Sequence, residues 1–165
     1  KAIKDVFGDY AEIQRCQWHK RENIVSYLPK SQQASMRNEL QQAYEKDTYK
    51  KARQALMKCR RKLEKINMSA ITSFDEGFEE TLTLHRLGVF PQLGISLKTT
   101  NCIESINAQL SRMLDRVTRW NNSNQKHRWL ASALLLIEPN LRKIKGYKAL
   151  HFLRHALQEK PKNNM

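Results

Sequence analysis

The sequence predicts a mostly α-helical chain with a small α/β portion near its N-terminal end. Apolar residues recur at steps of three and four through residues 31–66 and again through 103–117, which is the period of an amphipathic helix. Residues 10–16 alternate polar and apolar side chains, as a strand does. Residues 129–137 are apolar on every side, which is typical of a buried helix.

The first thirty residues are expected to form the end of a helix, a strand and a second helix. Ile3, Val6 and Phe7 make an apolar face that stops at Gly8, as at a helix C-terminus. We therefore expect the chain to begin within a helix and to be part of a larger protein. The strand over 10–16 follows, and Pro29 ends the next helix.

Residues 31–88 are expected to form a block of helices. One apolar stripe continues across a predicted break at Asp47 and Thr48, and a third helix, capped at Asn67 or Ser69, should run to Gly88. His85, alone on the apolar stripe of that helix, is interpreted as a core histidine and not as a ligand.

The outer side of the long helical stretch is strongly basic. Such a face is most often simply solvated, but its single sign leaves contact with phosphates as an alternative. The basic residues are Lys50, Lys51, Arg53, Lys58, Arg60, Arg61, Lys62 and Lys65.

Residues 89–98 are expected to be a loop or a short extended piece because they contain Pro91 and Gly94. The next helix should begin at Asn101, a good N-cap, with Glu104 at the capping-box position three residues on. From the residues alone, a helix-capping role is sufficient to explain Glu104.

The region after this helix combines basic and aromatic side chains, a combination that can clamp phosphates and stack on bases. Trp129 is assigned to the core, and residues 159–165 are expected to be a disordered tail. The residues proposed to contact DNA are Arg112, Arg116, Arg119, Lys126 and Arg128.

Thirty Lys and Arg residues against sixteen Asp and Glu residues give a formal net charge of +14. This excess is typical of nucleic-acid binding proteins. An anionic membrane surface fits less well, because no helix combines a strong basic face with a broad aromatic one. The sequence contains neither a signal peptide nor roughly 18 consecutive apolar residues, so we expect a soluble intracellular protein.

Cys16, Cys59 and Cys102 are odd in number and widely spaced, which argues against a disulfide framework and fits a reducing compartment. Cys16 and His19 have the spacing of two zinc ligands, but no second pair follows at a zinc-finger distance. The simpler interpretation is a small buried cysteine beside a histidine that is hydrogen-bonded near a helix start.

Two blocks of sequence resemble Mutator-type transposases, the family that includes many bacterial insertion-sequence transposases. Residues 99–107, Thr-Thr-Asn-Cys-Ile-Glu-Ser-Ile-Asn, are similar to the family's T-T-N-x-I-E-S-x-N signature. Residues 15–29 are similar to its R-C-x-x-H-K-x-x-N-x-x-x-x-L-P block. The resemblance implies the C-terminal part of an RNase H-like fold interrupted by an all-helical insertion.

The resemblance also implies roles for individual residues. Glu104 would be catalytic and a metal ligand, as the third carboxylate of a DDE site, while Cys16, His19, Asn101 and Asn107 would support the site without binding its metal. Mg²⁺ or Mn²⁺ would bind only with two aspartates that should lie upstream of Lys1. We therefore expect this polypeptide alone to be inactive.

The resulting domain prediction has four parts: residues 1–30 as the tail of the RNase H-like core, 31–88 as the helical insertion, 89–158 as the glutamate helix with its C-terminal support, and 159–165 as the tail. The predicted function is that of a DNA transposase fragment. The complete protein would cleave insertion-sequence ends and join them to target DNA, as a homo-oligomer associated with the bacterial nucleoid in the cytoplasm and not with a membrane.

Two other functions remain open on the sequence. The first is a non-catalytic, basic, helical nucleic-acid-binding module in which Glu104 only caps a helix. The second is a zinc-dependent helical interaction protein that uses Cys16 and His19.

Overall fold

The computed structural model describes residues 2–8, 11–115, 117 and 119–159. Every regular element in these ranges is a helix. The chain divides into two compact units, Lys1–Thr99 with Gly146–Met165 and Thr100–Lys145, and each unit is described by itself. None of the helices in the described ranges is long and apolar enough to span a bilayer.

The first unit contains most of the helices. Their bounds are α1 Ala2–Phe7, α2 Gln17–Ser26, α3 Lys30–Tyr44, α4 Tyr49–Glu64, α5 Met68–Asp75, α6 Thr83–Arg86, α7 Phe90–Leu97 and α10 Leu150–Gln158, with 3₁₀ turns at Glu79–Leu82 and Tyr147–Ala149. The second unit contains α8 Asn101–Leu114, α9 Ser123–Ile137 and a 3₁₀ turn at Glu138–Asn140.

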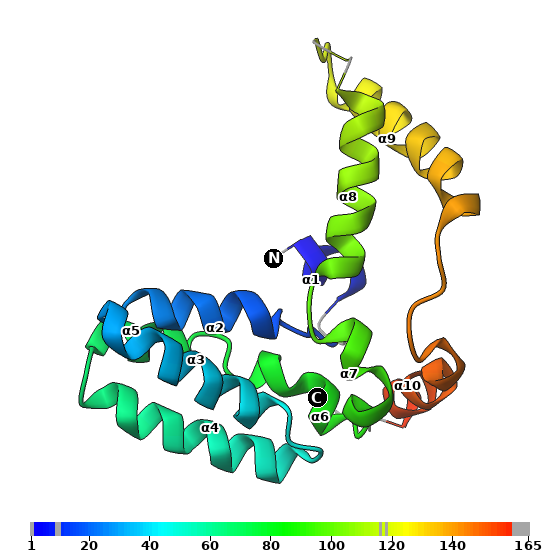
Figure 1. Ribbon diagram of the computed structural model, residues 1–165. Helices are drawn as coiled ribbons and strands as arrows, with labels where there is room; N and C mark the ends of the chain where they lie inside the picture. The colour runs from blue at the N-terminus through cyan, green and yellow to red at the C-terminus, as the bar shows by residue number, and fades with distance from the viewer. Residues whose placement is uncertain (1, 9–10, 116, 118, 160–165) are drawn as a thin grey trace. The chain divides into compact units, whose positions relative to one another are not determined.

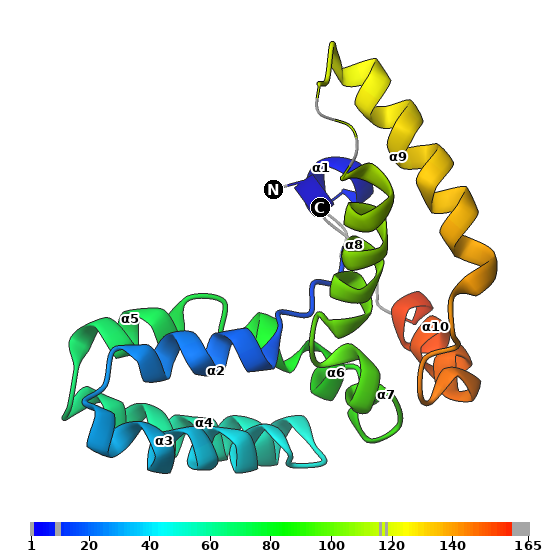
Figure 2. The ribbon, with the colours of Figure 1, turned by 45° about the horizontal axis from the view of Figure 1, so that its top comes forward.

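Helices α2, α3, α4 and α5 lie side by side and enclose the larger core (Figures 1 and 2). The side chains of Leu40, Leu56 and Leu63 are fully buried there. Removing each from water stabilises the bundle by about 1.5–3 kcal/mol. The apolar stripe expected over residues 31–66 is therefore the inner face of α3 and α4.

Local capping explains where several helices start and stop. The Thr48 hydroxyl accepts a hydrogen bond from the Lys51 backbone N–H at 3.4 Å, which confirms the predicted break before α4. The Asn67 side chain accepts one from the Ala70 N–H at 3.1 Å, so Asn67, and not Ser69, is the cap of α5. Gly8 has φ 75° and follows the last residue of α1, which confirms the predicted helix end.

The strand predicted over residues 10–16 is wrong for residues 11–16, so the small α/β portion is absent from the described ranges. The backbone of this segment bonds to a turn and not to a neighbouring strand. The Arg15 N–H donates to the Glu80 carbonyl at 2.9 Å, and the Ile13 carbonyl accepts from the Thr83 hydroxyl at 2.7 Å. The alternating polar and apolar pattern therefore corresponds to an extended segment that pairs with no strand among the described residues.

The single helix expected from Asn67 to Gly88 is also wrong, because it breaks after α5. Gly77 adopts φ +65°, which a helix cannot continue through. A Cβ atom there would collide with the guanidinium of Arg15, which donates from Nη1 to the Glu76 carbonyl at 2.8 Å. The chain resumes as a 3₁₀ turn and α6, and Gly88 ends α6 at φ +71° as predicted.

Within residues 89–98, predicted to be a loop or a short extended piece, Phe90–Leu97 form α7. Pro91 lies in the first turn, where a missing N–H costs no helical hydrogen bond. Gly94 lies against the ring of Phe90, which itself stacks on His85 with ring centroids 3.7 Å apart. Leu93 completes a second, smaller core, which Leu153 of α10 also contacts.

The second unit is a pair of helices, α8 and α9, that contact each other. Residues 129–137 were expected to be buried on all sides, and Trp129 was assigned to the core; both predictions are wrong. Trp129 is 46% exposed and Leu135 69% exposed, whereas Ala133 and Ile137 are buried. Helix α8 covers only one side of α9 among the described residues of this unit. Of the predicted disordered tail, residues 160–165 lie outside the described ranges.

Candidate functional site

The candidate site is centred on the first turns of α8. The helix begins at Asn101, but the N-cap position is Thr100, and neither provides a side-chain cap bond. The cap predicted at Asn101 is therefore wrong by one residue, and Glu104 lies one position beyond the capping-box site. The Glu104 carboxylate instead accepts a hydrogen bond from the Thr100 hydroxyl at 2.5 Å.

Glu104 lies on the polar side of α8, a helix in which no residue is fully buried. Its side chain is exposed, as are those of Asn101 and Asn107, while Ile106 and Leu110 are partly covered. Residues three apart adjoin on a helix surface, so Asn101, Glu104 and Asn107 form one polar row. A carboxylate in the first turn is favoured by the positive end of the helix. The row can therefore present an anionic oxygen ligand flanked by two amides.

Cys16 and His19 lie in the first unit, at the start of α2. Cys16 occupies the N-cap position of that helix and is buried, and His19 Nδ1 lies 3.1 Å from its sulfur. The ring of His19 packs edge-on to Trp18 with centroids 4.8 Å apart. The pair forms a local contact at a helix start, in agreement with the simpler interpretation of the sequence.

No group of three or more His, Cys, Asp or Glu side chains placed to hold a metal ion occurs within the described ranges. Magnesium takes oxygen ligands, and a two-ion site needs several carboxylates to hold its ions. Glu104 alone does not fit such a pair of ions. The Cys16–His19 pair likewise supplies only two of the four ligands that structural zinc takes.

The predicted DNA-contacting residues of the second unit flank the connection between its two helices. Arg112 lies near the end of α8, Arg119 in the connection, and Lys126 and Arg128 in the first half of α9, all of them exposed. Arg112 Nε donates to the Ala108 carbonyl of its own helix at 3.2 Å. Arg116 lies outside the described residues. The four described cations therefore belong to one end of this helix pair.

A buried lysine is the feature that sequence reasoning missed. Lys20 is 4% exposed, its Nζ lies 3.7 Å from Glu76 Oε2, and burial lowers the pKa of Lys20. Arg15 Nη2 pairs with Glu76 Oε1 at 2.9 Å. Arg15 and Lys20 both belong to the 15–29 block, but nothing in the sequence connects them to a glutamate so far along the chain.

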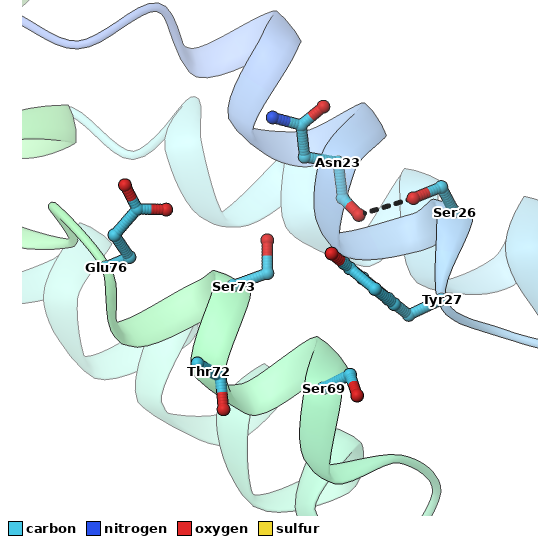
Figure 3. A pocket seen from close by; sticks show the side chains of 7 residues that line it. All are labelled: Asn23, Ser26, Tyr27, Ser69, Thr72, Ser73 and Glu76. Atoms are coloured by element: carbon cyan, nitrogen blue, oxygen red, sulfur yellow. Dashed lines mark hydrogen bonds between the residues drawn. The ribbon is translucent and has the colours of Figure 1, made fainter.

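Glu76 also borders a polar groove of about 490 Å³ between α2 and α5 (Figure 3). The Ser26 hydroxyl donates to the Asn23 carbonyl at 2.7 Å on its wall. Glu76 is the one carboxylate among the lining residues, and Arg15 already pairs with it, so the groove supplies no second metal-binding set. The lining residues are Asn23, Ser26, Tyr27, Ser69, Thr72, Ser73 and Glu76.

Comparison with protein families gave a match to the model described as "Transposase, Mutator family", over residues 1–140. The match covers both sequence blocks, residues 15–29 and 99–107. The searches against curated proteins and against solved structures gave no match.

Proposed function

Because the chain belongs to the Mutator family of transposases, we propose that it contributes Glu104 to a metal-dependent site that cleaves the ends of an insertion sequence and joins them to target DNA. The observation that supports this most directly is the position of the T-T-N-x-I-E-S-x-N block. It places Glu104 on an exposed polar row of α8, inside the matched region.

In this proposal the chain supplies an oriented carboxylate and not a whole site. The Thr100 hydroxyl holds one oxygen of Glu104 by its 2.5 Å hydrogen bond, and α8 provides the rigid support. When bound, Mg²⁺ or Mn²⁺ would polarise the phosphodiester. The other carboxylates would come from two aspartates that precede Lys1 in the complete transposase, so the chain alone is expected to be inactive.

The remaining sequence assignments belong to the same proposal. Cys16 and His19 shape the start of α2, and Asn101 and Asn107 flank the carboxylate. The cations Arg112, Arg116, Arg119, Lys126 and Arg128 would contact DNA. Residues 1–30 and 89–158 would be parts of an RNase H-like core, with 31–88 as its helical insertion, in a homo-oligomer associated with the bacterial nucleoid.

The test is cleavage of DNA that carries the element's ends by the full-length transposase containing this chain. We expect Glu104→Gln to slow Mg²⁺-dependent cleavage roughly 100-fold or more, because the oxygen ligand loses its charge. Binding of the same DNA should be unchanged.

The matched control is Asp115→Asn, which removes an exposed carboxylate just after the last turn of α8. A negative charge there opposes the helix dipole, so its loss should not lower stability. Cleavage should also stay unchanged, because Asp115 lies outside the proposed row of Asn101, Glu104 and Asn107. If Glu104→Gln cleaves as fast as Asp115→Asn, Glu104 has no part in the chemistry.

The second candidate is the non-catalytic nucleic-acid-binding module. The hydrogen bond between Thr100 and Glu104 favours it, because that bond gives the carboxylate a purely structural partner. In that case Glu104→Gln would lower the stability of α8 without a selective loss of cleavage.

A further inference from the structure

The outer side of α4 is basic along its whole length. Ala52, Leu56, Cys59 and Leu63 form the buried side of this helix. At 100° per residue, the opposite side is occupied by five cations, the last of them the C-cap residue Lys65, together with Gln54 and the partly covered Met57. The five cations, here called the α4 basic face, are all exposed: Lys50, Lys51, Lys58, Arg61 and Lys65.

The cations along the edges of α4 are already paired with acidic side chains of neighbouring elements. Arg60 binds Asp75 of α5 through two bonds of 2.7 Å. Arg53 lies 3.1 Å from Glu79, and Lys62 lies 2.7 Å from Glu39 of α3.

The α4 basic face differs from these edges. Its five side chains form no ion pair or hydrogen bond with the residues that the structure describes. Glu64 is the one acidic residue of α4, and it lies between the edge residue Arg60, four residues before it, and Arg61 of the face, three residues before it. Packing of the bundle therefore uses the edge cations and leaves five positive charges with no internal role.

We propose that the α4 basic face binds the phosphates of double-stranded DNA without reading its sequence. From Lys50 to Lys65 the face is about 22 Å long, over which a duplex presents on the order of thirteen phosphate charges. This choice of partner rests on the proposed function, since a transposase acts on duplex DNA.

The chemistry of the face excludes other classes of partner. None of the exposed large apolar side chains lies in α4, so the face offers nothing to insert into a bilayer or to form the core of a protein interface. No aromatic ring occurs among its residues to stack on the bases of a single strand. Charged side chains without exposed apolar neighbours are suited to a phosphate backbone.

The test compares two variants of the chain that lose equal charge. The face variant is K50Q/K51Q/K58Q/R61Q/K65Q. The control variant, K30Q/K46Q/R142Q/K148Q/R154Q, changes five exposed cations that lie outside both proposed DNA surfaces. Each removes five charges, which lowers the formal net charge from +14 to +9. Glutamine keeps a helix propensity close to that of Lys and Arg.

Binding is measured by fluorescence anisotropy with a labelled duplex of about 30 base pairs and arbitrary sequence, in EDTA, between about 50 and 200 mM salt. We expect the face variant to lose about 10- to 100-fold in affinity at the lower salt concentration. Its slope of log K against log salt should fall in magnitude by about 3–4, while the control loses less than about 1 in slope.

Equal losses in the two variants would overturn the proposal, because net charge alone would then explain binding. A third variant, K50R/K51R/K58R/K65R, keeps the charge and should bind like the parent chain; loss of binding there would also overturn the proposal. Because the assay contains no divalent metal, it measures DNA binding only. Its result therefore stands even if Glu104 proves not to be catalytic.

Discussion

His85 is a core histidine, as its place on an apolar stripe predicted. It is 3% exposed, and its Nε2 donates to the Tyr44 carbonyl at 3.1 Å. Its Nδ1 has no hydrogen-bond partner among the described residues. Burial of the ring disfavours its charged form and lowers the pKa of His85 below its ordinary value of 6.5.

This pKa shift makes stability depend on pH. As the pH falls through about 6.5, the unfolded chain takes up a proton at His85 while the folded chain keeps the ring neutral. His85 thus contributes stability above that pH and loses it below. We expect the free energy of unfolding in urea to fall between about pH 7.5 and 5.5, and His85→Gln to reduce that fall. His127→Gln, at an exposed position, is the control, and identical pH dependence in all three proteins would contradict this assignment.

The contact between the turn before α10 and helix α7 depends on one glycine. Gly146 leads into the turn before α10 with φ +81°, and a Cβ atom there would collide with the Gln92 carbonyl oxygen of α7. Gly88 has a similar φ of +71° but open space around it. Replacing Gly88 therefore tests backbone strain alone, whereas replacing Gly146 tests backbone strain together with the close approach of α7.

We expect Gly146→Ala to lower the free energy of unfolding by about 2–4 kcal/mol, the sum of left-handed strain and displacement of α7. Gly88→Ala should cost about 1 kcal/mol, from strain alone. Urea unfolding at one pH measures both. Equal costs would mean that α10 does not hold its described position against α7.

Elements with a long apolar stripe and a polar cap were predictable from the sequence. Helix α4 has both, because Leu56 and Leu63 repeat on one face after Thr48. Residues 89–98 were not, because Pro91 and Gly94 were interpreted only as helix breakers. In the structure Pro91 occupies the first turn, and Gly94 makes room for the Phe90 ring. That tertiary contact cannot be read from local propensity.

Partners far apart in the chain explain the other errors. Alternation over 10–16 could not reveal that its backbone would bond to Glu80 and Thr83. The apolar run of α9 predicted burial, but burial requires neighbours on every side. Helix α8 was predicted from its apolar period, with an error of one residue in the cap, and only the roles of Asn101, Glu104 and Asn107 came from the family resemblance. The Lys20–Glu76 pair gave no local signal.

At the scale of the whole molecule, some cations pair with acidic side chains within the fold, and others lie on the proposed DNA-binding surfaces. Edge cations of α4 are satisfied by acids of α3 and α5, while the α4 basic face and the cations of the second unit face outward. We propose that Glu104, within this basic molecule, is a metal ligand of the complete transposase.

The most direct test replaces Mg²⁺ by Fe²⁺ in the full-length transposase and adds ascorbate and peroxide. Hydroxyl radicals then cut the polypeptide beside the bound iron, and mass spectrometry locates the cuts. Since Fe²⁺ accepts carboxylate ligands, we expect cuts around residues 101–107 that excess Mg²⁺ suppresses and Glu104→Gln abolishes, while Asp115→Asn retains them. Cuts elsewhere with none near Glu104, or cuts that persist in Glu104→Gln, would contradict its role as a ligand.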